Sequence, residues 1–85
     1  MKSSTTPDFW RAYRSLPPDV RAQARKAYRL WAENPRHPSL RFAPKGDYWS
    51  VRVSRGWRAL ARQHEGTFYW FWIGAHDEYE RLLRG

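Results

Sequence analysis

The sequence contains no cysteine, so it offers neither disulfide bonds nor thiolate ligands for a metal. This absence fits a reducing compartment. The longest stretch without a charged residue runs from Gly66 to Ala75, too short for a transmembrane helix of ~20 residues. The first residues, MKSSTTPDF, lack the apolar core of a secretory signal. We therefore expect a cytoplasmic protein with no membrane-spanning segment.

Acidic residues are scarce. The sequence has eight Asp and Glu residues against 16 Lys and Arg residues, which gives a net charge of +8. Most of the cations are Arg. The Arg guanidinium binds phosphate through a planar fork and stacks on bases. The balance favours a polyanionic partner, either nucleic acid or an acidic protein. The alternative is that the charge only keeps a small basic protein soluble.

Aromatic residues are abundant for the length: six Trp, five Tyr and four Phe in 85 residues. Each buries ~150–250 Å², so a compact core is possible without disulfides. We expect a single domain over residues 1–85. Five consecutive aromatics, Phe68 to Trp72, precede Ile73 within the run from Thr67 to Ile73, which predicts a buried central strand.

The remaining pattern predicts an α+β fold, with an N-terminal helical hairpin packed on a four-stranded antiparallel sheet and a short C-terminal helix. Thr6 and Pro7 indicate a helix start, and residues 2–6 are either disordered or a short edge strand. The helices are expected over residues 7–15, 18–34 and 79–83. The strands are expected near residues 40–42 and over 48–54, 57–64 and 67–73.

The period-2 alternation of the two middle strands predicts one apolar and one basic sheet face. Arg52, Arg58 and Arg62 share the basic face with Tyr48, and Lys45 lies in the turn expected before this strand. Such a face suits single-stranded nucleic acid, because Arg holds phosphates and aromatic rings stack on bases. We take Arg52, Arg62, Tyr48 and Lys45 as candidate substrate contacts. The alternative is that these Arg residues only keep the sheet soluble.

His76 is the strongest single candidate for chemistry, because it lies between the end of the central strand and the last helix. Histidine can carry a proton in phosphodiester cleavage. The alternative is a residue that only packs or caps at a helix start. His37 and His64 are weaker candidates, and the spacing of the three histidines matches no metal-ligand motif. We expect neither a metal nor an organic cofactor.

Three segments resemble the RelE/ParE superfamily of toxins from type II toxin–antitoxin systems. They are HPSLRF (residues 37–42), YWSVRVSRGWRAL (48–60) and WFWIGAHDEYERLL (70–83). The resemblance implies a helical hairpin on an antiparallel sheet. It also implies a cognate antitoxin and one of two activities. RelE-like members cleave mRNA, usually on the ribosome, and ParE-like members inhibit DNA gyrase. A degenerate member that only binds RNA or an antitoxin is a third possibility.

The same resemblance assigns roles to individual residues. Arg58 matches an Arg that stabilises the phosphate in RelE-like nucleases, and His76 matches a His used for proton transfer. His37 resembles a His of some nucleolytic branches and is counted among the substrate contacts. The chain departs from its relatives at Ala75, where Ser or Thr is common, and it lacks the lysine cluster of RelE-like toxins. Tyr79 is the nearest counterpart of a C-terminal Tyr, without an assigned role.

Overall fold

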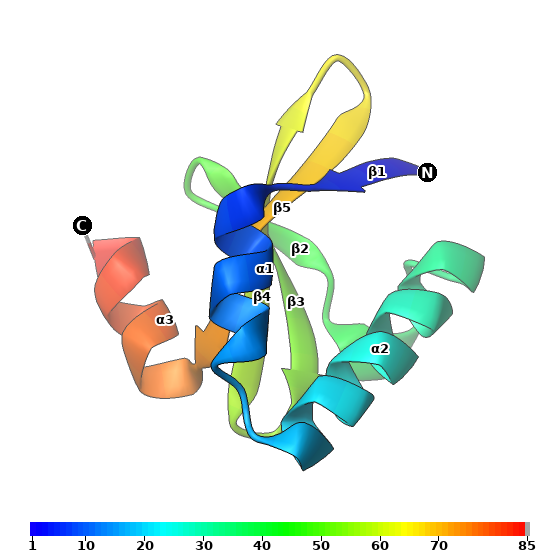
Figure 1. Cartoon of the computed structure of the whole chain (residues 1–85). Coiled ribbons are helices and arrows are strands. Elements are labelled where there is room, and N and C mark those ends of the chain that lie inside the picture. Colours follow the sequence, from blue (N-terminus) through cyan, green and yellow to red (C-terminus); the bar gives the residue numbers. More distant parts are fainter. Residues whose placement is uncertain (85) are drawn as a thin grey trace.

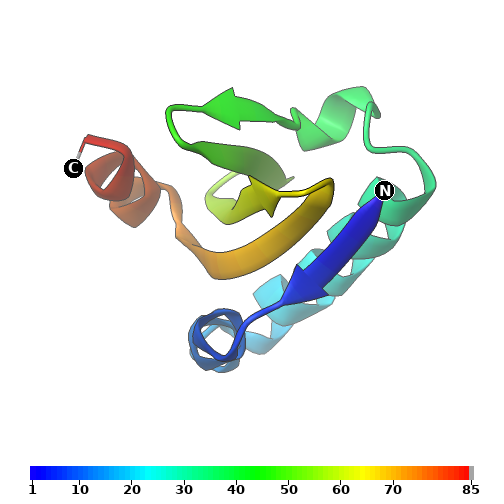
Figure 2. The ribbon, with the colours of Figure 1, turned by 90° about the horizontal axis from the view of Figure 1, so that it is seen from above.

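The computed structural model describes residues 1–84 and contains three α-helices and five strands (Figure 1). Two helices cover one face of the sheet, and the last helix lies on the opposite side (Figure 2). In chain order the elements are β1 (Lys2–Thr5), α1 (Pro7–Arg14), α2 (Pro18–Glu33), the 3-10 turn η1 (Pro38–Leu40), β2 (Ala43–Lys45), β3 (Tyr48–Ser54), β4 (Trp57–His64), β5 (Thr67–Ala75) and α3 (His76–Arg84). The predicted α+β class is confirmed.

The sheet differs from the prediction in strand number and direction. Its order is β1-β5-β4-β3-β2, so β4 is the middle strand, whereas the aromatic run of β5 was expected at the centre. The strand β1 pairs parallel to β5, with Lys2 opposite Thr67, and the sheet is therefore not wholly antiparallel. The sequence KSST carries no apolar alternation. Its strand conformation depends on a partner more than 60 residues away.

The strand expected near residues 40–42 was also misplaced. His37 and Pro38 begin a 3-10 turn in which Leu40 is buried, and Arg41 then takes a left-handed conformation with φ of 46°. This reversal delays the strand to Ala43–Lys45. Lys45 therefore belongs to β2 and pairs with Tyr48, and it does not lie in the turn.

The helical hairpin forms where the sequence predicted it. The Thr6 hydroxyl accepts a hydrogen bond from the Phe9 amide at 3.2 Å, which satisfies one of the free donors at the start of α1. The helix α1 packs on β5 and α2 packs on β3. The side chain of Trp31, on α2, is 2% exposed and meets Trp70 edge-on at a centroid distance of 5.4 Å.

Tyr28 departs from the apolar stripe that was predicted for α2. It is 47% exposed, and its hydroxyl lies 2.7 Å from that of Ser3 on β1. The last helix, α3, starts at His76, three residues before the predicted start. None of the helices in the described part of the chain is both long and apolar enough to cross a membrane.

Candidate functional site

The face of the sheet that points away from the hairpin carries the predicted cations. Ala59 and Ala61 of β4 lie in the core under the hairpin, so Arg58, Leu60 and Arg62 point the other way. Arg52 on β3 lies directly opposite Arg58. The sequence therefore assigned the Arg residues to the correct face, and the fold sets two like charges side by side at one end of it.

Arg58 is held in place by the hairpin between β3 and β4. Its Nη1 donates to the carbonyl oxygens of Ser54 (2.7 Å), Trp57 (2.9 Å) and Arg55 (3.3 Å). The other guanidinium N–H groups of Arg58 make no hydrogen bond within residues 1–84. The side chain is thus fixed by one nitrogen while the rest of its donor fork stays available to an anion.

The surroundings of Arg58 disfavour its charge. Burial lowers the pKa of Arg58, and the positive charges of Arg52 and Arg41 lower it further, while Tyr79 and Glu80 act in the opposite direction. A bound phosphate would relieve this repulsion, because it places negative charge between the cations. Arg41 was not among the predicted site residues. Its backbone is left-handed and its charge reaches Arg58, and no local pattern signals either feature.

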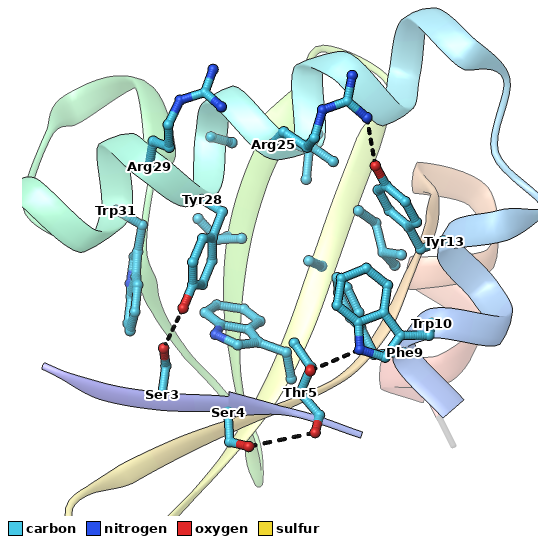
Figure 3. Close-up of a pocket in the computed structure, with 17 residues that line it drawn as sticks. Ser3, Ser4, Thr5, Phe9, Trp10, Tyr13, Arg25, Tyr28, Arg29 and Trp31 are labelled. Atoms are coloured by element: carbon cyan, nitrogen blue, oxygen red, sulfur yellow. Dashed lines mark hydrogen bonds between the residues drawn. The ribbon is translucent and has the colours of Figure 1, made fainter. Parts of the chain in front are cut away.

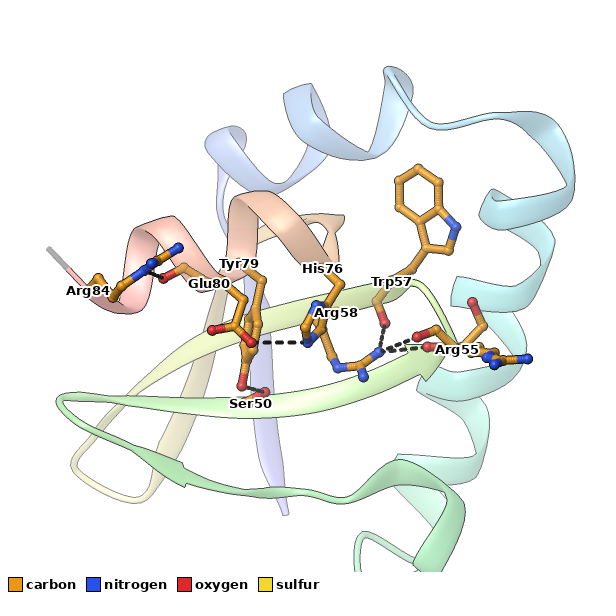
Figure 4. Close-up of polar contacts among 9 residues, drawn as sticks. Ser50, Arg55, Trp57, Arg58, His76, Tyr79, Glu80 and Arg84 are labelled. Atoms are coloured by element: carbon orange, nitrogen blue, oxygen red, sulfur yellow. Dashed lines mark hydrogen bonds and ion pairs between the residues drawn. The ribbon is translucent and has the colours of Figure 1, made fainter.

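His76 lies beside Arg58 at the start of α3 (Figure 4). Its backbone N–H donates to the Gly56 carbonyl at 2.9 Å, which ties α3 to the same hairpin that holds Arg58. Its Nε2 lies 3.3 Å from Oε1 of Glu80, one helical turn along, and its side chain is 41% exposed. The ring is therefore both oriented and open to solvent, as proton transfer to a substrate requires.

Tyr79 forms the floor between these groups. Its side chain is 7% exposed, and its hydroxyl accepts a hydrogen bond from the buried Ser50 hydroxyl at 3.0 Å (Figure 4). Leu60 faces away from the helical hairpin of α1 and α2. It is nevertheless completely buried, because α3 covers this part of the sheet. The buried side chain of Tyr79 therefore anchors α3 on the sheet.

Tyr48 and Arg62 meet at the other end of the same face. The Arg62 guanidinium carbon lies 5.5 Å from the Tyr48 ring centre and 4.5 Å from that of Phe71. Phe71, on β5, was not among the predicted site residues. Phe68 and Trp70 of β5 lie in the core, so the alternation of side chains along the strand already puts Phe71 on the opposite, basic face. Lys45 pairs with Tyr48 and adds charge at this end.

His37 has a structural role that the sequence did not predict. Its Nδ1 accepts a hydrogen bond from the Ser39 amide at 3.2 Å and lies 2.8 Å from the Ser39 hydroxyl, so it caps the 3-10 turn η1. No hydrogen bond or ion pair within residues 1–84 joins it to Arg58 or His76. Within that range no three acidic or histidine side chains cluster as a metal site would require.

A second surface lies on the hairpin side of the sheet, where α1 and α2 diverge (Figures 1 and 3). The groove between them has a volume of about 590 Å³. Its floor is the apolar sheet face around Ala59 and Ile73, and Phe9 and Trp31 form parts of its walls. Arg25 lies at its rim, where it donates to the Tyr13 hydroxyl at 2.7 Å.

Solved structures of bacterial toxins share this fold. YafQ from E. coli strain BL21(DE3) is similar with a TM-score of 0.73 and 10% sequence identity, over 92% of this chain and 96% of that one. The YoeB/ParE toxin from Agrobacterium tumefaciens has a TM-score of 0.65 and 20% identity, over 89% and 99%. The RelBE toxin–antitoxin complex of E. coli has a TM-score of 0.63 and 18% identity, over 87% and 94%.

No curated protein sequence matches the chain. A family model does: the model of the ParE-like toxin domain matches residues 18–81, from the start of α2 into α3. The matched range includes both Arg58 and His76 and takes in most of the chain. The protein therefore belongs to the ParE-like toxin family, within the RelE/ParE superfamily of toxins.

Proposed function

We propose that this protein is the toxin of a type II toxin–antitoxin system and that it inhibits translation in the cytoplasm by cleaving mRNA. The observation that carries the proposal is the pairing of Arg58 with His76 on an open sheet face. One side chain supplies positive charge for a phosphate and the other carries a proton. The similarity of the fold to RelE and YafQ supports the same activity.

The chemistry is an internal transfer within RNA. The 2′ oxygen attacks the adjacent phosphorus as its proton leaves, the bond to the 5′ oxygen breaks, and that oxygen takes up a proton. A 2′,3′-cyclic phosphate and a 5′ hydroxyl result. Arg58, with Arg52, stabilises the charge that grows on the phosphate oxygens. His76 transfers one of the two protons, and Glu80 fixes its ring by facing Nε2.

The test is to map new mRNA 5′ ends after brief expression of the toxin in cells, and to follow cleavage with purified protein and programmed ribosomes. We expect His76→Ala to slow cleavage by ~10²–10⁴-fold, the usual range for a general acid or base. We expect a loss of ~10²–10³-fold for Arg58→Ala, typical of a lost charge-stabilising group.

Two matched variants serve as controls. His64→Ala removes an exposed histidine at the far end of β4, and Arg14→Ala removes an exposed arginine from the end of α1. Both should cleave as the wild type does. Wild-type protein that produces no new ends within coding regions would refute the nuclease proposal.

The family model that matches the chain is the ParE-like one, and this favours a second candidate, the inhibition of DNA gyrase without nuclease chemistry. This activity predicts that cleaved DNA–gyrase complexes accumulate with purified protein while mRNA stays intact. His76→Ala would then have no effect on toxicity, because no proton transfer is needed.

We further propose an acidic antitoxin as the partner. RelB–RelE complexes of similar fold from Methanococcus jannaschii and Pyrococcus horikoshii OT3 support it, as do the +8 charge and the apolar groove between α1 and α2. Apolar side chains of the antitoxin would fill the groove, and its Asp and Glu would meet Arg52, Arg58 and Arg62. Complementary charge mainly speeds association, whereas buried anchors set the residence time.

A stopped-flow salt series tests this partner. Association should slow steeply as salt rises, while dissociation should change little. Reversing the charges of Arg58 and Arg62 together should weaken the complex, and His76→Ala should leave it intact. An association rate that is indifferent to salt would mean that the basic face does not take part in docking.

A further inference from the structure

The aromatic pair at the far end of the basic face has an arrangement that the proposed chemistry does not use. The rings of Tyr48 and Phe71 come from strands that are not neighbours, and their centres lie 5.1 Å apart at 57°. The guanidinium of Arg62, on the strand between them, lies over both rings. All three side chains are at least partly exposed.

A β-bulge at Phe71 sets which side chains of β5 join it on the basic face. Leu60 pairs with Trp72 and Ala61 pairs with Trp70, so Phe71 has no partner in the ladder. Bulges redirect side chains and are frequent next to functional sites. If strict alternation continued past Phe71 without a bulge, Trp72 would lie in the core with Phe68 and Trp70. With it Phe71 and Trp72 both leave the core, and Ile73 takes the core position.

This cluster lies on the path that a substrate held by Arg58 would follow. Arg62 is four residues beyond Arg58 on the same face of β4, a separation of about 13 Å at ~3.3 Å per residue. Tyr79 and Leu60 fill the space between them. Lys45 beside Tyr48 continues the positive charge. A few nucleotides of extended single-stranded RNA span this distance.

We propose that Tyr48, Arg62 and Phe71 form a base-stacking subsite that holds one nucleobase of a single-stranded RNA whose scissile phosphate lies at Arg58. A guanidinium lying on aromatic rings presents its outer face to a base, and single-stranded RNA is commonly bound by such stacking. An acidic peptide would use the charge of Arg62 and would gain nothing from the rings. The subsite rests on the proposed RNA cleavage, and it supplies the position-specific contact that the phosphate site lacks.

The test uses the full chain and a set of short RNAs that carry 2-aminopurine at one position each. A 2′-O-methyl group at the scissile nucleotide blocks the attacking oxygen, so that binding is measured without cleavage. The fluorescence of 2-aminopurine falls when the base stacks. We expect strong quenching at one position, a few nucleotides from the blocked one, and little at the others.

Phe71→Leu removes the ring and keeps an apolar side chain, and Phe71→Tyr keeps the ring as a matched control. We expect Phe71→Leu to weaken binding by about 5- to 150-fold, the range that corresponds to the loss of one stacked base, and to abolish the quenching. Phe71→Tyr should retain both. Arg62→Gln should weaken binding and reduce its salt dependence. Thermal unfolding of each variant confirms that it is folded.

The outcomes separate this subsite from the proposed function. If Phe71→Leu binds and quenches as the wild type does, or if quenching is equal at every position, the stacking subsite is wrong even where cleavage is observed. If wild-type protein shows position-specific quenching that depends on Phe71 but never cleaves unmodified RNA, the subsite holds and the nuclease proposal fails.

Discussion

Gly74→Ala is the substitution whose cost follows most directly from the structure. Gly74 is buried on β5 and pairs with Arg58 across the ladder. A Cβ at this position would lie 2.5 Å from Cζ2 of Trp72 and 3.0 Å from Cη2. Carbon atoms in contact prefer ~3.5–4.0 Å, so the indole would have to shift by about 1 Å. The backbone of Gly74 is not left-handed, and the cost is therefore steric alone.

Overpacking of this kind costs ~1–3 kcal/mol. In a domain of this size each kcal/mol shifts Tm by ~4–8 °C, so we expect Tm to fall by roughly 4–24 °C. Circular dichroism during heating, together with urea unfolding, measures the change. Gly56→Ala is the matched control, because its added Cβ meets nothing within 4 Å, and it should stay within ~0.5 kcal/mol of the wild type.

A double-mutant cycle tests the assigned cause. Trp72→Leu removes the ring atoms that the new Cβ would strike, so Gly74→Ala should cost much less in that background, with a coupling of ~0.5–3 kcal/mol. The reasoning is refuted if the Gly74→Ala variant has the same Tm as the Gly56→Ala variant. It is also refuted if Gly74→Ala costs as much with Leu at position 72 as it does with Trp.

Three further substitutions probe contacts near the site. Tyr79→Phe should cost ~1–3 kcal/mol in urea unfolding, because it leaves the buried Ser50 hydroxyl without its partner, and adding Ser50→Ala should recover part of this loss. Thr6→Ala should cost ~1 kcal/mol, because the cap of α1 is lost, and Thr6→Ser should not; equal unfolding midpoints would contradict this. His37→Ala should lower Tm through the lost cap of η1 and leave the cleavage rate per folded molecule unchanged. A rate loss like that of His76→Ala would instead place His37 in the reaction.

The two middle strands could be predicted from the sequence because their side-chain pattern is purely local. In β3 and β4 every second residue is apolar or small, and this alternation alone assigns Val51 and Ala59 to the core and Arg52 and Arg58 to the open face. The starts of α1 and α2 were equally accessible, because Thr6 and Pro18 act within one turn of chain.

The features that the sequence missed or left open depend mostly on tertiary packing. Residues 2–6 were left open between disorder and a short edge strand, and β1 forms as an edge strand because β5 offers it a parallel neighbour. The bulge at Phe71 puts Trp70 and Ile73, three residues apart, on the same face of β5, which a period-2 pattern cannot express. Arg41 contributes to the site through its charge, and nothing in the local sequence indicates that this charge reaches Arg58. Sequence patterns therefore identified which residues share a face, and tertiary packing decided which of them meet.

The groove and the pair of Arg58 and His76 lie on opposite faces of the sheet, and this constrains how one partner could cover both. The groove lies on the face of Ala59, and Arg58 and His76 lie on the other. An occupant of the groove alone would not cover the basic face, because neighbouring residues of β4 point in opposite directions. The edge strand β2 is only three residues long and contains Pro44, so it is a poor template for an added strand. A chain that fills the groove and also covers Arg58 must therefore pass around an edge of the sheet. A peptide limited to the groove should bind without protecting RNA, and one that also reaches Arg58 should do both.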